Sequence, residues 1–248
     1  LHSQRDVPER AAKTEAMMNR MRHAAMIFGV TEQSQKLVEE LYLEYLDALN
    51  AHFESYPYLL GWRPCIGDFG LLAPMYAHLG RDPHPSRLMQ QCAPAVYRWV
   101  ERMNREDQDA PEYFNAGSDF LTDDEVPETL IEVLKILAED FVPETLAAAD
   151  RINGWLGKHQ PEGGATAVGR LAEALGTADF TVRSQQITSL AQPHRFYLLQ
   201  RVHDAFADFS QEKRDEVSAL LEACDIAPIL TTTLDRRIVR CNNLEVWH

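Results

Sequence analysis

The sequence predicts a mostly helical protein, in which a helical bundle over residues 1–160 is followed by a smaller α+β extension over residues 161–248 that contains a β-hairpin. Two observations predict this division. Apolar residues recur at spacings of three and four through the first part, which is the period of an amphipathic helix. Strand-like apolar residues first appear after the segment KHQPEGG, where Pro and Gly interrupt the helical pattern. A chain of 248 residues is long enough to bury a sizeable core in one or two domains.

Four amphipathic helices are predicted in the first hundred or so residues. Proline residues favour the first turn of a helix, and Thr31 has the side chain to cap the second helix. Pro94 lies inside the fourth segment, where it predicts a kink or a break because it removes a backbone donor. The segments run from Pro8 to Gly29, from Thr31 to Phe53, onward from Pro64, and from about Pro85 to Met103.

The second half of the sequence changes from helical to mixed patterns. Residues 107–124 are rich in Asp, Gly, Pro and Asn and predict a loop. A long helix is then expected from 125 to about 156, bent near Pro143. The extension is predicted to contain strand-like residues around Phe180, Val182 and Ile187, short helices over 196–209 and 212–224, and a hairpin in ILTTTLDRRIVRC that turns at Asp235-Arg236.

The composition excludes several classes of function. There are 24 Lys and Arg residues against 38 Asp and Glu, and the formal charge of −14 repels phosphate backbones and anionic membrane surfaces. We therefore expect no nucleic-acid partner and no membrane partner. The four cysteines form no C-x-x-C pair, and we expect reduced thiols in the cytoplasm. No apolar run reaches the roughly 18–20 residues of a membrane span. The absence of an initial Met suits a piece of a longer protein.

The segment LLGWRPCIGDFGLLAPMYAHLG, residues 59–80, contains a helix start with an unusual cap. Three residues separate Cys65 from Asp68, which is the spacing of a capping box, and Asp68 also suits the positive end of the helix dipole. Pro64 and Phe69 stand where a hydrophobic staple would be. Asp68 could instead be a catalytic acid, but capping alone accounts for a carboxylate at this position.

This segment resembles the C-terminal, all-helical domain of the glutathione S-transferase family. The family carries a Leu-Gly pair, a Pro, and then a Ser or Thr followed by an Asp at the start of a buried helix. Cys65 departs from the family pattern, and a thiol is a weaker acceptor than a hydroxyl. The matching positions are Leu60, Gly61, Pro64, Cys65, Ile66, Gly67, Asp68 and Phe69, with Pro94, Val96 and Trp99 in the next helix.

The resemblance implies where a co-substrate would bind. In the family, the first helix of this domain lines the cleft for the electrophilic co-substrate, and here that helix carries Met17, Met18, Met21 and Met26. Methionine adapts to irregular apolar ligands, but packing in an ordinary core is the favoured interpretation of these residues, because an amphipathic helix needs them in any case. Arg22 and His23 are the expected polar contacts, and Tyr76 is expected to reach the same cleft from the third helix.

Other clusters carry weaker signals. The sequence has no G-x-S-x-G, no H-E-x-x-H and no Gly-rich phosphate loop, and the catalytic residues remain unknown. His78, Asp82, His84 and Cys92 meet no template spacing, so we expect no metal site. His194, Arg195 and His203 are expected on a solvated face. The segment 228–242 is a less favoured alternative for a glutathione site.

The resemblance implies a glutathione-dependent transferase, of which this chain would supply the co-substrate wall and the dimer-forming helices. Glutathione is the implied co-substrate, a small electrophilic or apolar molecule is the implied substrate, and a homodimer is the implied assembly. Family members hold glutathione mainly in a thioredoxin-like domain, which this sequence does not contain. We therefore expect this chain to be inactive alone. The alternatives are a non-enzymatic interaction or assembly module and, less favoured, a helical ligand carrier.

Overall fold

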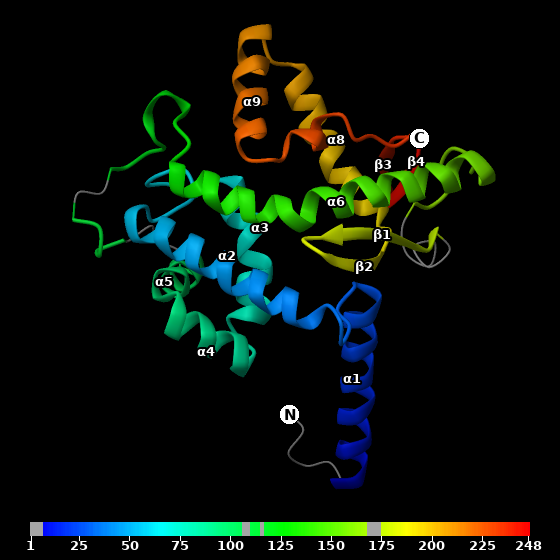
Figure 1. Cartoon of the computed structure of the whole chain (residues 1–248), viewed down its shortest axis with the longest axis horizontal. Helices are drawn as coiled ribbons and strands as arrows, with labels where there is room; N and C mark the ends of the chain where they lie inside the picture. The colour runs from blue at the N-terminus through cyan, green and yellow to red at the C-terminus, as the bar shows by residue number, and fades with distance from the viewer. Residues whose placement is uncertain (1–6, 106–109, 115–116, 168–174) are drawn as a thin grey trace. The chain divides into compact units, whose positions relative to one another are not determined.

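A computed structural model describes residues 7–105, 110–114, 117–167 and 175–248 (Figure 1). The chain folds into two compact units, each assembled from separate stretches of the sequence. We call residues 39–138 and 220–226 the bundle unit, and residues 1–38, 139–219 and 227–248 the mixed unit. The boundary at residue 160 that the sequence suggests is not tested by this division and stays a prediction.

Helices account for most of the described chain, which confirms the fold class. Two of them pass from one unit into the other, since residues 35–38 of α2 and 139–159 of α6 fall in the mixed unit. The helices of the first 159 residues are α1 (Val7–Ile27), α2 (Gln35–Ser55), α3 (Ile66–Pro74), the π-helical turn η1 (Met75–Leu79), α4 (Pro83–Cys92), α5 (Pro94–Met103), the short 3-10 turn η2 (Thr122–Asp124) and α6 (Glu128–His159).

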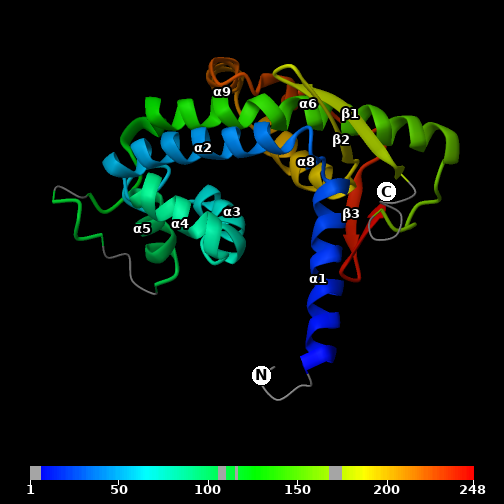
Figure 2. The same ribbon diagram turned by 60° about the horizontal axis from the view of Figure 1, so that its bottom comes forward.

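The core of the bundle unit forms where α3, α4 and α5 gather beside α2 (Figure 2). Phe53 of α2 and Trp99 of α5 are fully buried, and their rings stack with centroids 5.0 Å apart. Burying two large aromatic side chains contributes several kcal/mol, of which the stacking geometry adds about 0.5–1.5 kcal/mol. Tyr58 and Ala93 complete this core together with the apolar residues Leu46, Leu49, Met75, Met89, Val96, Val100, Leu130 and Val133.

The predicted break at Pro94 is confirmed. Helices α4 and α5 are separate, and Ala93 between them has φ −139° and ψ 63°, outside the helical region. Pro94 then occupies the first position of α5, where its missing N–H costs nothing. By contrast, α6 continues through Pro143.

The mixed unit contains two antiparallel hairpins and two further helices. Strands β1 (Thr177–Val182) and β2 (Gln185–Leu190) pair with each other, as do β3 (Ile238–Cys241) and β4 (Leu244–Trp247). Along β1 the side chains alternate between exposed and buried, which explains the strand-like pattern of Phe180 and Val182. The helices are α8 (Pro193–Ala207) and α9 (Gln211–Ala223), and the 3-10 turn η3 covers Ala227–Leu230.

The predicted turn of the second hairpin at Asp235-Arg236 is wrong. The strands instead turn at Asn242 and Asn243, which have φ values of 49° and 63°. A two-residue turn with positive φ at both positions matches the twist of the strands, and Asn tolerates this conformation better than most residues. Asp235 is held elsewhere, because its backbone N–H donates to Asn153 Oδ1 at 2.9 Å.

No helix in the described part of the chain is both long enough and apolar enough to cross a membrane.

The turn geometry predicts opposite effects for two substitutions at one position. Asn243→Gly should leave stability unchanged or raise it, because Gly adopts positive φ without strain. Asn243→Val should lower the free energy of unfolding by about 1 kcal/mol or more, since a β-branched residue is disfavoured there. Thermal unfolding of the two variants would test this, and equal midpoints would contradict the assigned turn.

Candidate functional site

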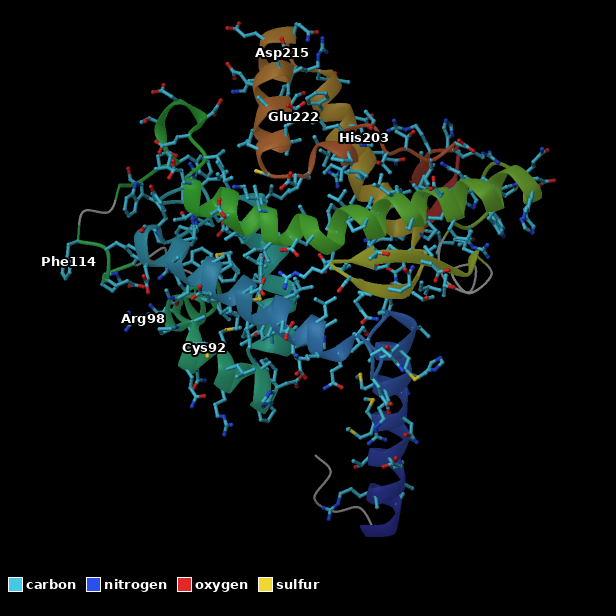
Figure 3. All side chains as sticks on the ribbon, in the orientation of Figure 1. Cys92, Arg98, Phe114, His203, Asp215 and Glu222 are labelled. Atoms are coloured by element: carbon cyan, nitrogen blue, oxygen red, sulfur yellow. The ribbon has the colours of Figure 1, made fainter. Side chains whose placement is uncertain are left out.

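Helix α1 presents apolar side chains to solvent. Its methionines and the adjacent Phe28 are each about half exposed, at 49% for Met17, 45% for Met18, 53% for Met21, 60% for Met26 and 48% for Phe28. Sulfur atoms accordingly lie along the outside of α1 in Figure 3. A helix that only filled a core would bury these side chains. We call these exposed residues together the methionine face, in which Met17 and Met21 follow one side of α1 and Met26 lies on the other side.

The two polar residues predicted on α1 behave differently. Arg22 bonds within its own helix, donating to Asn19 Oδ1 at 2.9 Å and to Glu15 Oε1 at 3.1 Å. Both contacts are exposed, so they contribute little to stability and can be exchanged for a ligand. His23 lies one residue further along and borders a hollow at the C-terminal end of the helix.

This hollow, which we call the α1 pocket, has a volume of about 430 Å³. It is open on one side and combines apolar with uncharged polar side chains, and His23 is its one titratable lining residue among those described. Pockets for small organic molecules commonly begin at about 300 Å³. Its lining comes from α1, the turn after it and both strands of the first hairpin: His23, Met26, Ile27, Gly29, Thr31, Gln33, Thr177, Gln185, Gln186, Ile187 and Thr188.

The tight turn that follows α1 packs against the first hairpin and shapes the floor of the pocket. Gly29 has φ +86°, and a Cβ there would lie 2.6 Å from Ile187 Cγ2, so only glycine fits. The buried Ser34 hydroxyl donates to the Gly29 carbonyl at 2.5 Å. Ser34 Oγ also accepts from the Thr31 backbone N–H at 2.8 Å, which fixes the start of α2. The pocket floor is therefore rigidly held.

Tyr76 belongs to the bundle unit and does not line the α1 pocket. Its hydroxyl accepts a hydrogen bond from Arg81, whose guanidinium lies 5.0 Å from the centre of the Tyr76 ring. The structure therefore places Met26 and His23 at one site, and Tyr76 at another. Sequence reasoning missed the hairpin residues 185–188, because only the three-dimensional packing brings them to α1.

The capping box at the start of α3 is confirmed in the bundle unit. The Cys65 backbone N–H donates to Asp68 Oδ2 at 2.9 Å, and the Asp68 backbone N–H faces the Cys65 sulfur in return. The expected staple is less complete, since Phe69 is 60% exposed. Burial raises the pKa of the Cys65 thiol, so the thiolate form that reacts as a nucleophile is disfavoured.

Asp68 does more than cap a helix. The residue is fully buried, and its second oxygen accepts from the Trp99 indole N–H at 2.9 Å and from the Leu59 backbone N–H at 3.2 Å. A fully buried carboxylate whose two oxygens both accept from protein donors is not accessible for proton exchange with a substrate. The structure supports the capping interpretation over a catalytic acid.

His52 is a second buried polar group of the bundle unit. Its Nδ1 lies 2.8 Å from Thr129 Oγ1, and its Nε2 lies 3.3 Å from the Tyr58 carbonyl. Burial lowers the pKa of His52, while the contact with the Tyr58 backbone and the nearby Asp68 carboxylate oppose that shift. The residue joins α2 to α6 in the bundle unit and has the environment of a structural histidine.

The described residues contain no group of three or more His, Cys, Asp and Glu side chains that could hold a metal ion. Cys92, which meets no template spacing for a metal site with His78, Asp82 and His84, is exposed at the C-terminal end of α4 (Figure 3).

Of the three residues expected on a solvated face, His194 is exposed and Arg195 and His203 are half-buried, and all three make contacts within the mixed unit. His194 Nδ1 lies 2.7 Å from the buried Glu245, and Arg195 donates to Glu144 and, at 3.0 Å, to Thr145 Oγ1. His203 on α8 lies with its Nε2 2.8 Å from the Ile229 carbonyl (Figure 3).

These features define a helical bundle built on an N-capped, buried helix start, and a mixed unit that carries an exposed apolar helix and its pocket. Residues 13–107 match the family model described as glutathione S-transferase, C-terminal domain. The matched range runs from α1 to the residues after α5, and it contains the methionine face, His23 and the capping box. No curated protein and no solved structure matches the chain.

The contacts of Asp68 predict a large loss of stability when the carboxylate is removed. Asp68→Ala leaves the N–H groups of Leu59, Cys65 and Trp99 without their acceptor, and each buried orphan donor costs about 1–3 kcal/mol. We expect the free energy of unfolding to fall by at least about 3 kcal/mol. Denaturant unfolding would measure it. Trp99→Phe, which removes one donor and keeps the carboxylate, should cost less, and equal losses would contradict the shared-acceptor arrangement.

Cys65→Ser is predicted to be neutral or stabilising. The substitution retains the size class of the side chain and supplies a better acceptor for the Asp68 backbone N–H. Denaturant midpoints of the two proteins would decide the matter. If Cys65→Ser clearly lowered stability, the sulfur would have to act as a packed apolar group. In that case Cys65→Ala would retain only part of the packing that the sulfur provides.

Proposed function

We propose that this chain is the co-substrate-binding part of a glutathione S-transferase-like protein that works in the cytoplasm as a homodimer. The observation that carries the proposal is that α1, inside the matched range 13–107, bears both the exposed methionines and one wall of the α1 pocket. The expected ligand is a small electrophilic or apolar molecule. On the Met17 and Met21 side of the helix its body would bury apolar surface, and in the α1 pocket His23 would supply a polar contact.

The proposal assigns the sulfur chemistry to a different part of the protein. Conjugation needs glutathione as its thiolate, and a nearby hydrogen-bond donor lowers the thiol pKa and raises the population of that nucleophile at neutral pH. A thioredoxin-like domain would hold glutathione and supply this donor. The helical part would hold the electrophile close to the sulfur, which converts a bimolecular encounter into a positioned reaction.

A non-enzymatic interaction module is the second candidate. The exposure of the methionine face also favours it, because flexible methionines suit a surface that binds a partner protein. The two candidates differ in their ligands. A co-substrate wall binds small apolar molecules saturably, whereas an assembly surface needs a partner of larger area.

Two binding measurements on the 248-residue chain would test the proposal. We expect no saturable binding of glutathione by calorimetry, and saturable binding of the neutral apolar dye N-phenyl-1-naphthylamine by fluorescence. Replacing Met17 and Met21 together by Gln should weaken dye binding by about fivefold or more, because the ligand loses apolar contact. Transferase activity should appear only when a thioredoxin-like domain is present.

Leu198→Gln provides the matched control, since Leu198 is an equally exposed apolar residue at 48% on α8. It should leave dye binding unchanged. Equal dye affinity for the wild type and the double variant would contradict the role of the methionine face. Tight glutathione binding by this chain would contradict the assignment of the sulfur chemistry and would direct attention to the segment 228–242.

A further inference from the structure

A second hollow lies on the surface of α6, outside the matched range 13–107. Its volume is about 420 Å³, and its lining comes from the last turns of this one helix in the mixed unit. At 3.6 residues per turn, positions 150, 154 and 158 follow one another along a single face. The lining residues are Asp150, Arg151, Gly154, Trp155, Lys158 and His159, and we call this site the α6 hollow.

Gly154 leaves the floor of the hollow open. No described atom lies within 4 Å of the position that a Cβ of Gly154 would take, and the same holds for Gly157. Glycine is the least favourable residue in a helix interior apart from proline. Neither position has positive φ, so backbone geometry does not require glycine there. The packing of the described residues therefore gives no structural reason for Gly154, and its effect is to create space.

Cationic side chains border this space. Arg151 is held in place, since its Nε donates to the Leu175 carbonyl at 2.6 Å and its guanidinium packs over Gly176. Lys158 is exposed on the next turns of the same face. Asp150 is the one acidic side chain of the lining, so the cations outnumber the anions in a protein whose formal charge is −14. Charged side chains that border a bound ligand dominate the electrostatic potential at that ligand.

The aromatic side of the hollow is rigid. The rings of Trp155 and His159 stack with centroids 4.6 Å apart, and His159 Nδ1 lies 2.9 Å from the Trp155 carbonyl. Trp155 also lies 6.3 Å from the ring of the fully buried Trp247. An aromatic side chain held on two sides offers apolar contact at little cost in conformational entropy.

We propose that the α6 hollow binds a small organic anion with an aromatic or apolar body. The anionic group, a carboxylate or sulfonate, pairs with Arg151 and Lys158, and the body lies over Gly154 against Trp155. Guanidinium and ammonium groups are the side chains that bind such anions most strongly. This site does not rest on the proposed co-substrate function, because none of its residues belongs to the methionine face or the α1 pocket.

The probe is 2-naphthalenesulfonate, titrated into the full 248-residue chain by calorimetry at low salt. Gly154→Leu fills the hollow without a clash, and should weaken binding by about tenfold or more. Gly157→Leu makes the same change outside the hollow and should leave binding within about twofold of wild type. Both variants replace a helical glycine by a better helix former, so their thermal midpoints should be equal to or above that of the wild type.

Charge variants give effects of opposite sign. Lys158→Gln should weaken binding of the sulfonate by about threefold or more, and Asp150→Asn should strengthen it by a similar factor, because each changes the local potential by one charge. The neutral analogue 2-naphthol should respond to neither. The proposal is overturned if the wild type does not bind the sulfonate saturably, if Gly154→Leu binds as wild type does, or if Gly157→Leu loses as much affinity. The predicted binding of the dye to the methionine face is independent of these outcomes, so the two proposals are tested separately.

Discussion

The buried Asp68 carboxyl group sets the arrangement of the bundle unit. Moving a carboxylate out of water is costly unless donors replace the lost hydration. Here the replacement comes from three separate segments: the loop at Leu59, the helix start at Cys65 and the indole of Trp99 on α5. All three must be in place together, since a missing one leaves a buried polar group unsatisfied. Trp99 in turn stacks on Phe53, which extends the constraint to α2.

The mixed unit depends on a similar use of charge, over long sequence separations. Glu144 of α6 accepts from Arg195 on α8 and, at 2.9 Å, from the Ser189 hydroxyl on β2, so one side chain joins a helix to a strand and another helix. The hydroxyl of the next residue, Thr145, accepts from the same Arg195. Glu245 of β4 is paired with His194 of α8, which adds a second polar tie to that helix. Such ties restrict how the elements of a small hydrophobic core pack together.

The sequence predicted what depends on local pattern. The helices follow from apolar spacing, the break before α5 from Pro94, and the cap of α3 from the spacing of Cys65 and Asp68. The hairpin turn was misplaced although the sequence carried a signal for it, since Asn242 and Asn243 tolerate the positive φ of this turn better than Arg236 would. Periodicity also carries no information about distant partners. The contacts of His194 and the strand residues beside His23 therefore could not be predicted from the sequence.

The strong negative charge of the whole chain does not prevent anion binding at one place on it. Charges on an exposed surface are screened over about 8 Å at physiological ionic strength, so a bound anion senses mainly its nearest neighbours. At the α6 hollow these are Arg151 and Lys158 opposed by Asp150. The lining of the α1 pocket contains no Asp, Glu, Lys or Arg, so the ligand proposed there would depend on apolar contact. The two sites therefore select chemically different ligands, and charge on the ligand is the property that distinguishes them.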